Sequence, residues 1–390
     1  MDAASFFVQA LNGLAAASSL FLVAAGLSLI FGVTRIVNFA HGSFFMLGVY
    51  VAYSLVSHAA PVVSSALSVV LGDAASQTTA YFLLLLCAAI VTGMLGALVE
   101  MLVLRRIYKA PELFQLLATF ALVLVIQDGT LWLWGAEDLL GPRAPSLSGA
   151  VDILGRRFPT YDLFLIVIGP LVLVVLWWCL QHTRFGVLVR AATQDRAMLS
   201  ALGVNPRHLF TAVFALGCAL AGLGGALQLP REPAHLGLDM ATIGDAFVVV
   251  VVGGMGSIPG AFVAALLIAE IKALCIAVGT IEILGVSFAF SKLTLVAEFL
   301  VMAGVLMVRP WGLLGKPQST PRASTEQETP FALSSVRTQR VWLCVGAALL
   351  ALPLFTADSP YTLVLGIDLL IAALFATSLH FIMGPAGMHS

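Results

Sequence analysis

Residues Gln181–His208, QHTRFGVLVRAATQDRAMLSALGVNPRH, form a polar stretch between two apolar runs that could each cross a bilayer. Its charged residues are the acid Asp195 and the bases Arg184, Arg190, Arg196 and Arg207. An excess of arginine in a short loop beside membrane spans places that loop on the cytoplasmic side. The stretch therefore predicts a cytoplasmic loop that sets the orientation of the spans on either side of it.

The same stretch also has the pattern of a short helix. Apolar residues recur in it at roughly helical spacing, at Leu188, Met198, Leu199 and Leu202. Gly203 is expected just past the end of this helix, and Asn205-Pro206 prevents its continuation. A capped helix with an apolar stripe, held between two membrane spans, could dock a partner. The alternative is an ordinary charged loop that only fixes orientation.

The composition is that of a membrane protein. Of the 390 residues, 60% are hydrophobic and only 10% are charged. The mean hydropathy is +1.04, and soluble domains are typically about 25% charged. The net charge of −1 offers no basic face to nucleic acid. The five cysteines lie in apolar runs without metal-type spacing, so no metal site is expected.

The predicted fold class is all-α, a polytopic transmembrane helical bundle. A span needs about 20 mostly apolar residues, which predicts about eight spans up to residue 315. They are about Phe6–Phe31, about Phe39–Ser57, one that follows the Ala-, Ser- and Val-rich stretch His58–Thr79 and ends near Leu104, about Leu113–Trp134, Tyr161–Leu180, about Leu209–Leu229, Ala261–Val278 and Ser291–Val308. Because no Lys or Arg precedes the first apolar run, the N-terminus is expected on the periplasmic side.

The sequence DAFVVVVVGGMGSIPG, Asp245–Gly260, predicts a broken helix. Its apolar run Phe247–Val252 is too short to cross a bilayer, and the Gly- and Pro-containing turn that follows would interrupt any helix. We expect a re-entrant half-span, which marks transport pathways. The alternative is a simple short span with a Gly-rich turn. Gly253, Gly254 and Gly256 are gate candidates because of their backbone freedom.

The loop after the first span, GVTRIVNFAHG, contains Arg35, Asn38 and His41 within a few residues. Polar groups at membrane depth are tolerated only where protein or a water-filled cavity surrounds them, so these three are also gate candidates. The alternative is a tight cytoplasmic turn in which Arg35 anchors the headgroup region. Glu270 and Lys272 pose a similar choice between a functional role and snorkelling near a helix end.

Several kinds of enzyme site are missing. Gly312-Leu-Leu-Gly315-Lys316-Pro317 is not a Walker A motif, because its glycine spacing is wrong and no Ser or Thr follows the Lys. No metal-ligand cluster and no hydrolase signature appear. The chain is therefore expected not to be an enzyme. If ATP drives it, ATP and Mg bind another polypeptide, and this chain binds no cofactor.

The composition changes abruptly after the last of these spans. Residues 1–315 are expected to form one transmembrane domain, and residues 316–340, rich in Pro, Ser and Thr, a polar linker. Two further spans, Val341–Phe355 and Leu363–Met383, are expected in residues 341–390.

Four stretches together resemble the LivH-type permeases of branched-chain amino-acid ABC importers. They are SLIFGVTRIVNFAHGSFFMLGVYVAY (Ser28–Tyr53), RAATQDRAMLSALGVN (Arg190–Asn205), AFVVVVVGGMGSIPGAF (Ala246–Phe262) and VLMVRPWGLLG (Val305–Gly315), in the family's order. The second resembles the loop that contacts the ATPase, which implies a coupling role for Arg190, Ala191, Ala192, Asp195, Leu199 and Gly203. Gln194 departs from the pattern, because an acidic residue is expected beside Asp195.

The resemblance implies ATP-driven import of branched-chain amino acids across the bacterial inner membrane. ABC ATPase subunits would bind the cytoplasmic loop, and a LivM-type permease would be the partner in the membrane. A periplasmic binding protein would deliver the amino acid to the outer loops, including Gly135–Thr160 and Pro230–Asp245. Permeases for urea or short amides share these motifs, so they remain an alternative.

The C-terminal stretch LLIAALFATSLHFIMGPAGMHS, Leu369–Ser390, resembles the start of a LivM-type permease. The expectation is therefore a LivH-like domain, a linker and the beginning of a LivM-like domain, either a truncated product or a fragment of a fused permease. Three rivals remain. An ion-coupled secondary transporter would use intramembrane carboxylates such as Asp128, Glu270 and Glu298. The others are a membrane-embedded enzyme and a non-transporting assembly subunit.

Overall fold

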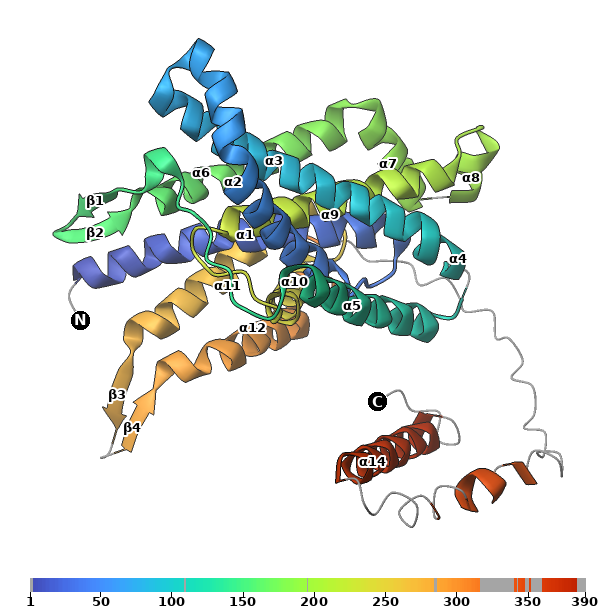
Figure 1. Cartoon of the computed structure of the whole chain (residues 1–390). Helices are drawn as coiled ribbons and strands as arrows, with labels where there is room; N and C mark the ends of the chain where they lie inside the picture. Colours follow the sequence, from blue (N-terminus) through green and yellow to red (C-terminus); the bar gives the residue numbers. More distant parts are fainter. Residues whose placement is uncertain are drawn as a thin grey trace. The chain divides into compact units, whose positions relative to one another are not determined.

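A computed structural model describes residues 3–108, 110–194, 196–283, 286–315, 340–341, 343–347, 351 and 360–383. The chain forms two compact units, Met1–Gln318 and Ser319–Ser390 (Figure 1). The predicted linker, apart from its last residue, and much of the predicted span Val341–Phe355 lie outside the described residues.

Helices dominate the first unit. They are α1 (Ala3–Thr34), α2 (His41–Leu71), α3 (Asp73–Val99), α4 (Arg105–Ile107), α5 (Glu112–Trp134), α6 (Thr160–His182), α7 (Arg184–Gln194), α8 (Arg196–Ala201), α9 (Pro206–Gln228), α10 (Leu238–Gly253), α11 (Ile258–Val278) and α12 (Thr294–Val308). A π-helical turn, Glu100–Leu104, joins α3 to α4, and short 3-10 turns lie at Pro145–Leu147 and Phe290–Leu293. Two antiparallel hairpins pair β1 (Ala150–Ile153) with β2 (Arg156–Pro159) and β3 (Thr280–Ile283) with β4 (Val286–Ala289). The second unit contains α14 (Pro360–Met383).

The structure confirms the predicted polytopic helical bundle. Within the described part of the chain, nine helices are long and apolar enough to cross a membrane. The last of these, within α14, corresponds to the predicted span Leu363–Met383, and the others lie in the first unit. With 16 residues, α10 is shorter than a full crossing requires, as expected for a half-span.

The second predicted span was wrong in its length. It was expected to end near Ser57, but α2 continues to Leu71, and α3 begins only one residue after Gly72. Pro61 lies inside the helix without ending it, and the helix ends only at the next glycine, Gly72. That residue has a φ of +76°, and its N–H donates to the Ser68 carbonyl.

The bundle is organised around α1 and α9. In α1, 78% of the apolar span is buried, and the helix packs against α6, α9, α10 and α11. Helix α9 lies among α1, α2 and α3, as Figure 1 shows. Close packing here depends on the small residues of α9, which include Gly217, Gly222 and Gly225. Gly48 of α2, for example, faces the backbone of Gly222 in α9.

Gly222→Ala is expected to destabilise the bundle, although alanine is the better helix former. A Cβ at this position would lie 2.6 Å from the Cβ of Thr92 in α3. Overpacking of this kind typically costs about 1–3 kcal/mol, so we expect the Tm of the detergent-purified chain to fall by roughly 2–10 °C. Gly129→Ala in α5 is the matched control, because nothing lies within 4 Å of its Cβ position. An equal Tm change in the two variants would contradict this packing argument.

Candidate functional site

The stretch between α6 and α9, residues 183–205, is called the coupling segment below. It contains two short helices, α7 and α8, where the sequence predicted one, and Asp195 between them lies outside the described residues. Gly203 follows α8 with a φ of +83°, and the Val204 N–H donates to the Leu199 carbonyl at 3.3 Å. The Asn205 side chain then caps α9 by accepting the Arg207 N–H at 3.0 Å. The predicted helix end and stop at this point are confirmed.

The residues predicted to contact an ATPase divide into two groups in the structure. Arg190 donates to the Leu180 carbonyl at the end of α6, and Ala192 and Leu199 are buried. Ala191 is half-buried, and Gly203 is exposed. Arg190, Ala192 and Leu199 therefore hold the coupling segment on the bundle and leave little surface for a partner.

The apolar side chains that the coupling segment does expose are different ones. Val187, Met198 and Leu202 have exposed fractions of 53%, 60% and 74%. Met198 and Leu202 belong to the apolar stripe read from the sequence, but the stripe alone could not separate them from the buried Leu199. They give the coupling segment an apolar outer surface.

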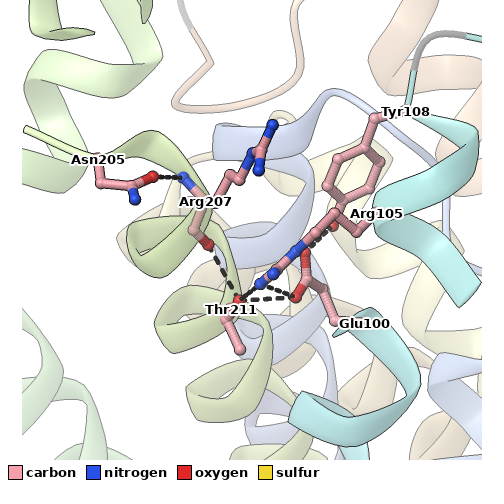
Figure 2. Close-up of polar contacts among 6 residues, drawn as sticks. All are labelled: Glu100, Arg105, Tyr108, Asn205, Arg207 and Thr211. Atoms are coloured by element: carbon pink, nitrogen blue, oxygen red, sulfur yellow. Dashed lines mark hydrogen bonds and ion pairs between the residues drawn. The ribbon is translucent and has the colours of Figure 1, made fainter. Parts of the chain in front are cut away.

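A buried carboxylate ties the start of α9 to the end of α3. Glu100 lies in the π-helical turn and is fully buried. Its Oε2 is 3.2 Å from Nη2 of Arg105 and accepts the Thr211 hydroxyl at 2.7 Å, and its Oε1 accepts the Tyr108 hydroxyl at 3.1 Å (Figure 2). Arg105 also donates to Oγ1 of Thr211 at 2.6 Å. We call these four residues the Glu100 cluster.

The Glu100 cluster was not predicted. In the sequence, Glu100 stands alone in an apolar run, and Arg105 is the first basic residue after it. The two residues are five apart, a spacing that does not bring side chains together on an α-helix. The π-helical turn changes that geometry, and Thr211 comes from a helix more than 100 residues further along the chain.

The turn between α10 and α11, residues 253–257, is called the gate turn. Gly254 and Gly256 have φ values of +99° and +85°, a region that favours glycine. The Val252 and Gly253 carbonyls accept the N–H groups of Leu313 and Leu314 at 2.8 and 3.1 Å, after the end of α12. Gly256 lies against Gly32 near the end of α1. Three motifs that are far apart in sequence therefore meet at the gate turn.

The other three predicted gate residues differ in their surroundings, because two are buried and one is exposed. Asn38 is buried, and its side-chain oxygen accepts the Ala40 N–H at 3.2 Å. His41 is fully buried, and its Nε2 lies 3.0 Å from the Val23 carbonyl oxygen in α1. Arg35 is exposed and has a φ of +57°, just past the end of α1. This position agrees with the alternative of a tight turn for Arg35.

Lys272 does not snorkel. Its Nζ lies 2.7 Å from Oδ2 of Asp245 in α10 and 2.7 Å from Oε2 of Glu298 in α12. The ion pairs connect the half-span α10 to α11 and α12. Glu270, two residues earlier in α11, has a buried Oε1 that lacks a hydrogen-bond partner among the described residues and lies next to Gly13. Asp128 is exposed.

Two outer loops are joined by a short antiparallel bridge. Leu139 and Ala234 exchange both backbone hydrogen bonds, at 3.0 and 2.9 Å. The bridge places the loop after α5, which carries the β1–β2 hairpin, beside the segment that connects α9 to α10. These are the two loops to which the sequence assigned contact with a binding protein.

The chain is similar to known transport proteins over most of its length. Residues 9–309 match the family described as branched-chain amino acid transport system / permease component. The high-affinity branched-chain amino acid transport system permease protein LivH of Escherichia coli K12 is 25% identical over 327 residues, which cover 80% of this chain and 96% of the relative. The high-affinity branched-chain amino acid transport system permease protein BraD of Pseudomonas aeruginosa is 25% identical over 320 residues, which cover 80% of this chain and 97% of the relative. A probable LivH of Methanocaldococcus jannaschii is 26% identical over 314 residues, 76% and 88% of the two chains. No solved structure matches the chain.

With a family match over more than three quarters of its length, this multi-pass membrane protein belongs to the permease components of branched-chain amino acid transport systems.

Proposed function

We propose that the chain is the permease subunit of an ATP-driven ABC importer that moves branched-chain amino acids across the bacterial inner membrane. The family description and the names of the relatives support this substrate class over urea or short amides, and an ABC importer over an ion-coupled carrier. The single observation that carries the mechanism is the coupling segment, a pair of short helices fixed to the bundle with apolar side chains exposed.

In this mechanism an ATPase subunit, which holds ATP and Mg, binds the exposed surface formed by Val187, Met198 and Leu202. Closure of the ATPase then shifts the coupling segment. Since α9 follows this segment and is central to the bundle, movement reaches α1 and α2 directly. The importer would thus have two states, and ATP would favour one of them.

The gate is proposed to consist of the gate turn with Asn38 and His41. Glycines at 253, 254 and 256 allow the turn to pack against the ends of α1 and α12, and small shifts there would open or close a path. Arg35 is left out of the gate because it is exposed.

The proposed orientation of the spans in the membrane rests on the positions of the charged residues, and the proposed protein partners rest on the family. Arg105, Arg184 and Arg309 lie at helix ends that would face the cytoplasm, which puts the N-terminus and the bridged outer loops in the periplasm. A periplasmic binding protein would dock on those loops. A LivM-type permease would be the membrane partner, and α14 would be a span of a LivM-like segment that follows the linker.

The test is retention of a candidate partner ATPase by the detergent-purified chain. Met198→Glu combined with Leu202→Glu places two charges on the proposed contact surface without touching the buried residues of the coupling segment. Burying an unpaired charge in an interface costs several kcal/mol, so we expect at least a hundredfold weaker ATPase binding.

Leu154→Glu in the β1–β2 hairpin is the control, because Leu154 is 66% exposed on the opposite side of the proposed membrane. Arg190→Glu is a poor probe, since it would remove the contact with the Leu180 carbonyl and disturb the fold. ATPase binding that is equal in the native chain and the double variant would refute the role of this surface.

A further inference from the structure

A cleft of about 660 Å³ lies between α1, α10 and α11. Along α1 it extends from Gln9 to Val23, which corresponds to about 21 Å of helix axis, well over half of a bilayer's hydrocarbon core. Its remaining walls include Phe45 of α2 and the segment after α9 that carries Arg231 and Glu232. The residues that line this cleft lie toward the ends of α9 and α11 that lead into the outer loops. We therefore call the cleft the outer cleft.

Charged groups of both signs line the outer cleft. Asp245 and Lys272 face it as a pair, and Glu298, which also contacts Lys272, is buried. The Asp245 side chain is 32% exposed, so it can accept hydrogen bonds from an added ammonium group. Arg231 uses its Nε to contact Asp162 at 3.0 Å, and a guanidinium has five N–H donors, so further donors can serve an added carboxylate.

Between the charged groups the outer cleft is apolar. Leu20 supplies most of the branched apolar surface, Phe45 and Leu238 add small exposed areas, and Ala16 and Ala269 leave space beside it. An apolar pocket with a few charged groups of both signs suits a small zwitterion with a hydrophobic side chain better than it suits an inorganic ion or a lipid tail.

The deep end of the outer cleft meets a proposed gate residue. Val23 lines the cleft, and its carbonyl oxygen contacts Nε2 of His41 at 3.0 Å. The Nδ1 of His41 is buried and has no hydrogen-bond partner among the described residues. The outer cleft therefore ends at a residue whose carbonyl contacts the region assigned to the gate.

We propose that the outer cleft binds the transported amino acid inside the permease, with its ammonium group at Asp245, its carboxylate at Arg231 and its side chain on Leu20 and Phe45. This inference rests on the proposed function and adds a binding site to it. The site would hold the amino acid after its release from the binding protein and before the gate opens.

Binding of radiolabelled leucine to the purified full chain in nanodiscs tests the proposal, with two competitors. One is 4-methylpentanoate, which lacks the amine, and the other is 3-methylbutylamine, which lacks the carboxylate. Leucine should bind at least about tenfold more tightly than either competitor, because each loses one charge-assisted contact. Asp245→Asn should weaken leucine binding about tenfold and leave 4-methylpentanoate unaffected, and Arg231→Gln should weaken leucine and spare the amine.

Asp152→Asn on β1 is the control, an exposed acid outside the outer cleft, and it should leave leucine binding unchanged. Retention of the partner ATPase verifies that each variant is folded and tests the proposed function separately. A native chain that retains the ATPase but binds no leucine, or binds it no better than the two competitors, overturns the site and leaves the permease function standing. Unchanged leucine binding in both cleft variants overturns it as well.

Discussion

Replacement of Glu100 with alanine is expected to abolish ATP-coupled transport and to lower the Tm of the purified chain by roughly 6–12 °C. The change removes the carboxylate that Arg105, Tyr108 and Thr211 share. Arg105 then loses its ion pair, and the two hydroxyl groups lose the acceptor of their hydrogen bonds. Breaking a buried ion pair typically costs about 3–5 kcal/mol. Because the Arg105 side chain is 30% exposed and can still reach water, the lower end of that range applies. Thermal unfolding in detergent and uptake in proteoliposomes measure the two effects.

A milder variant separates coupling from stability. Glu100→Gln keeps one acceptor oxygen, for either Tyr108 or Thr211, and replaces the second oxygen and its charge with an amide NH2, so we expect a cost of about 1–3 kcal/mol. Thr211 lies in the first turns of α9, just after the coupling segment, so the variant should retain the partner ATPase while less amino acid is moved per ATP hydrolysed. Glu137→Ala, an exposed acid in the loop after α5, is the control. Transport that fell only in proportion to the amount of folded protein would assign the Glu100 cluster a purely structural role.

Features that depend on local sequence were predictable. The bounds of α5 differ from the prediction by a single residue, because Pro111 precedes the helix and Gly135 follows it. Hydropathy was sufficient for the other full spans of the first unit except α2, where the Ala- and Ser-containing stretch 58–71 is less apolar and was assigned to a loop. The Gly-Pro pattern after Val252 predicted the break between α10 and α11.

Features that depend on tertiary partners were not predictable. Arg190 is a charged residue of the kind expected to contact a partner at the surface. In the structure, however, α6 ends close enough for the Arg190 guanidinium to reach the Leu180 carbonyl. Lys272 is near the end of α11, where snorkelling is common, but Asp245 and Glu298 arrive from two other helices. In each case the deciding partner is distant in sequence or lies on another helix, so periodicity and spacing carry no information about it.

Gly254→Ala is expected to reduce transport about a hundredfold. Gly254 has φ +99° and ψ 117°, a conformation that costs a residue with a Cβ about 1–3 kcal/mol. Its Cβ would also overlap the backbone of Gly315 and Trp311, which cannot move aside as a flexible side chain could. Together these effects exceed about 3 kcal/mol, and every 1.4 kcal/mol is a factor of ten in an equilibrium. The packed form of the gate turn would then be rarely populated, and uptake into proteoliposomes measures the loss.

Gly244→Ala gives the matched control for this change. Gly244 lies in α10, the helix that ends just before Gly254, but nothing lies within 4 Å of its Cβ position and no positive φ is required there. Alanine should therefore leave transport unchanged and should slightly favour the helix. The ATPase should still bind the Gly254 variant, because the coupling segment is a separate part of the bundle. If Gly254→Ala transported as well as Gly244→Ala, the gate turn would not need its observed conformation, and the gate would have to be sought at Asn38 and His41 alone.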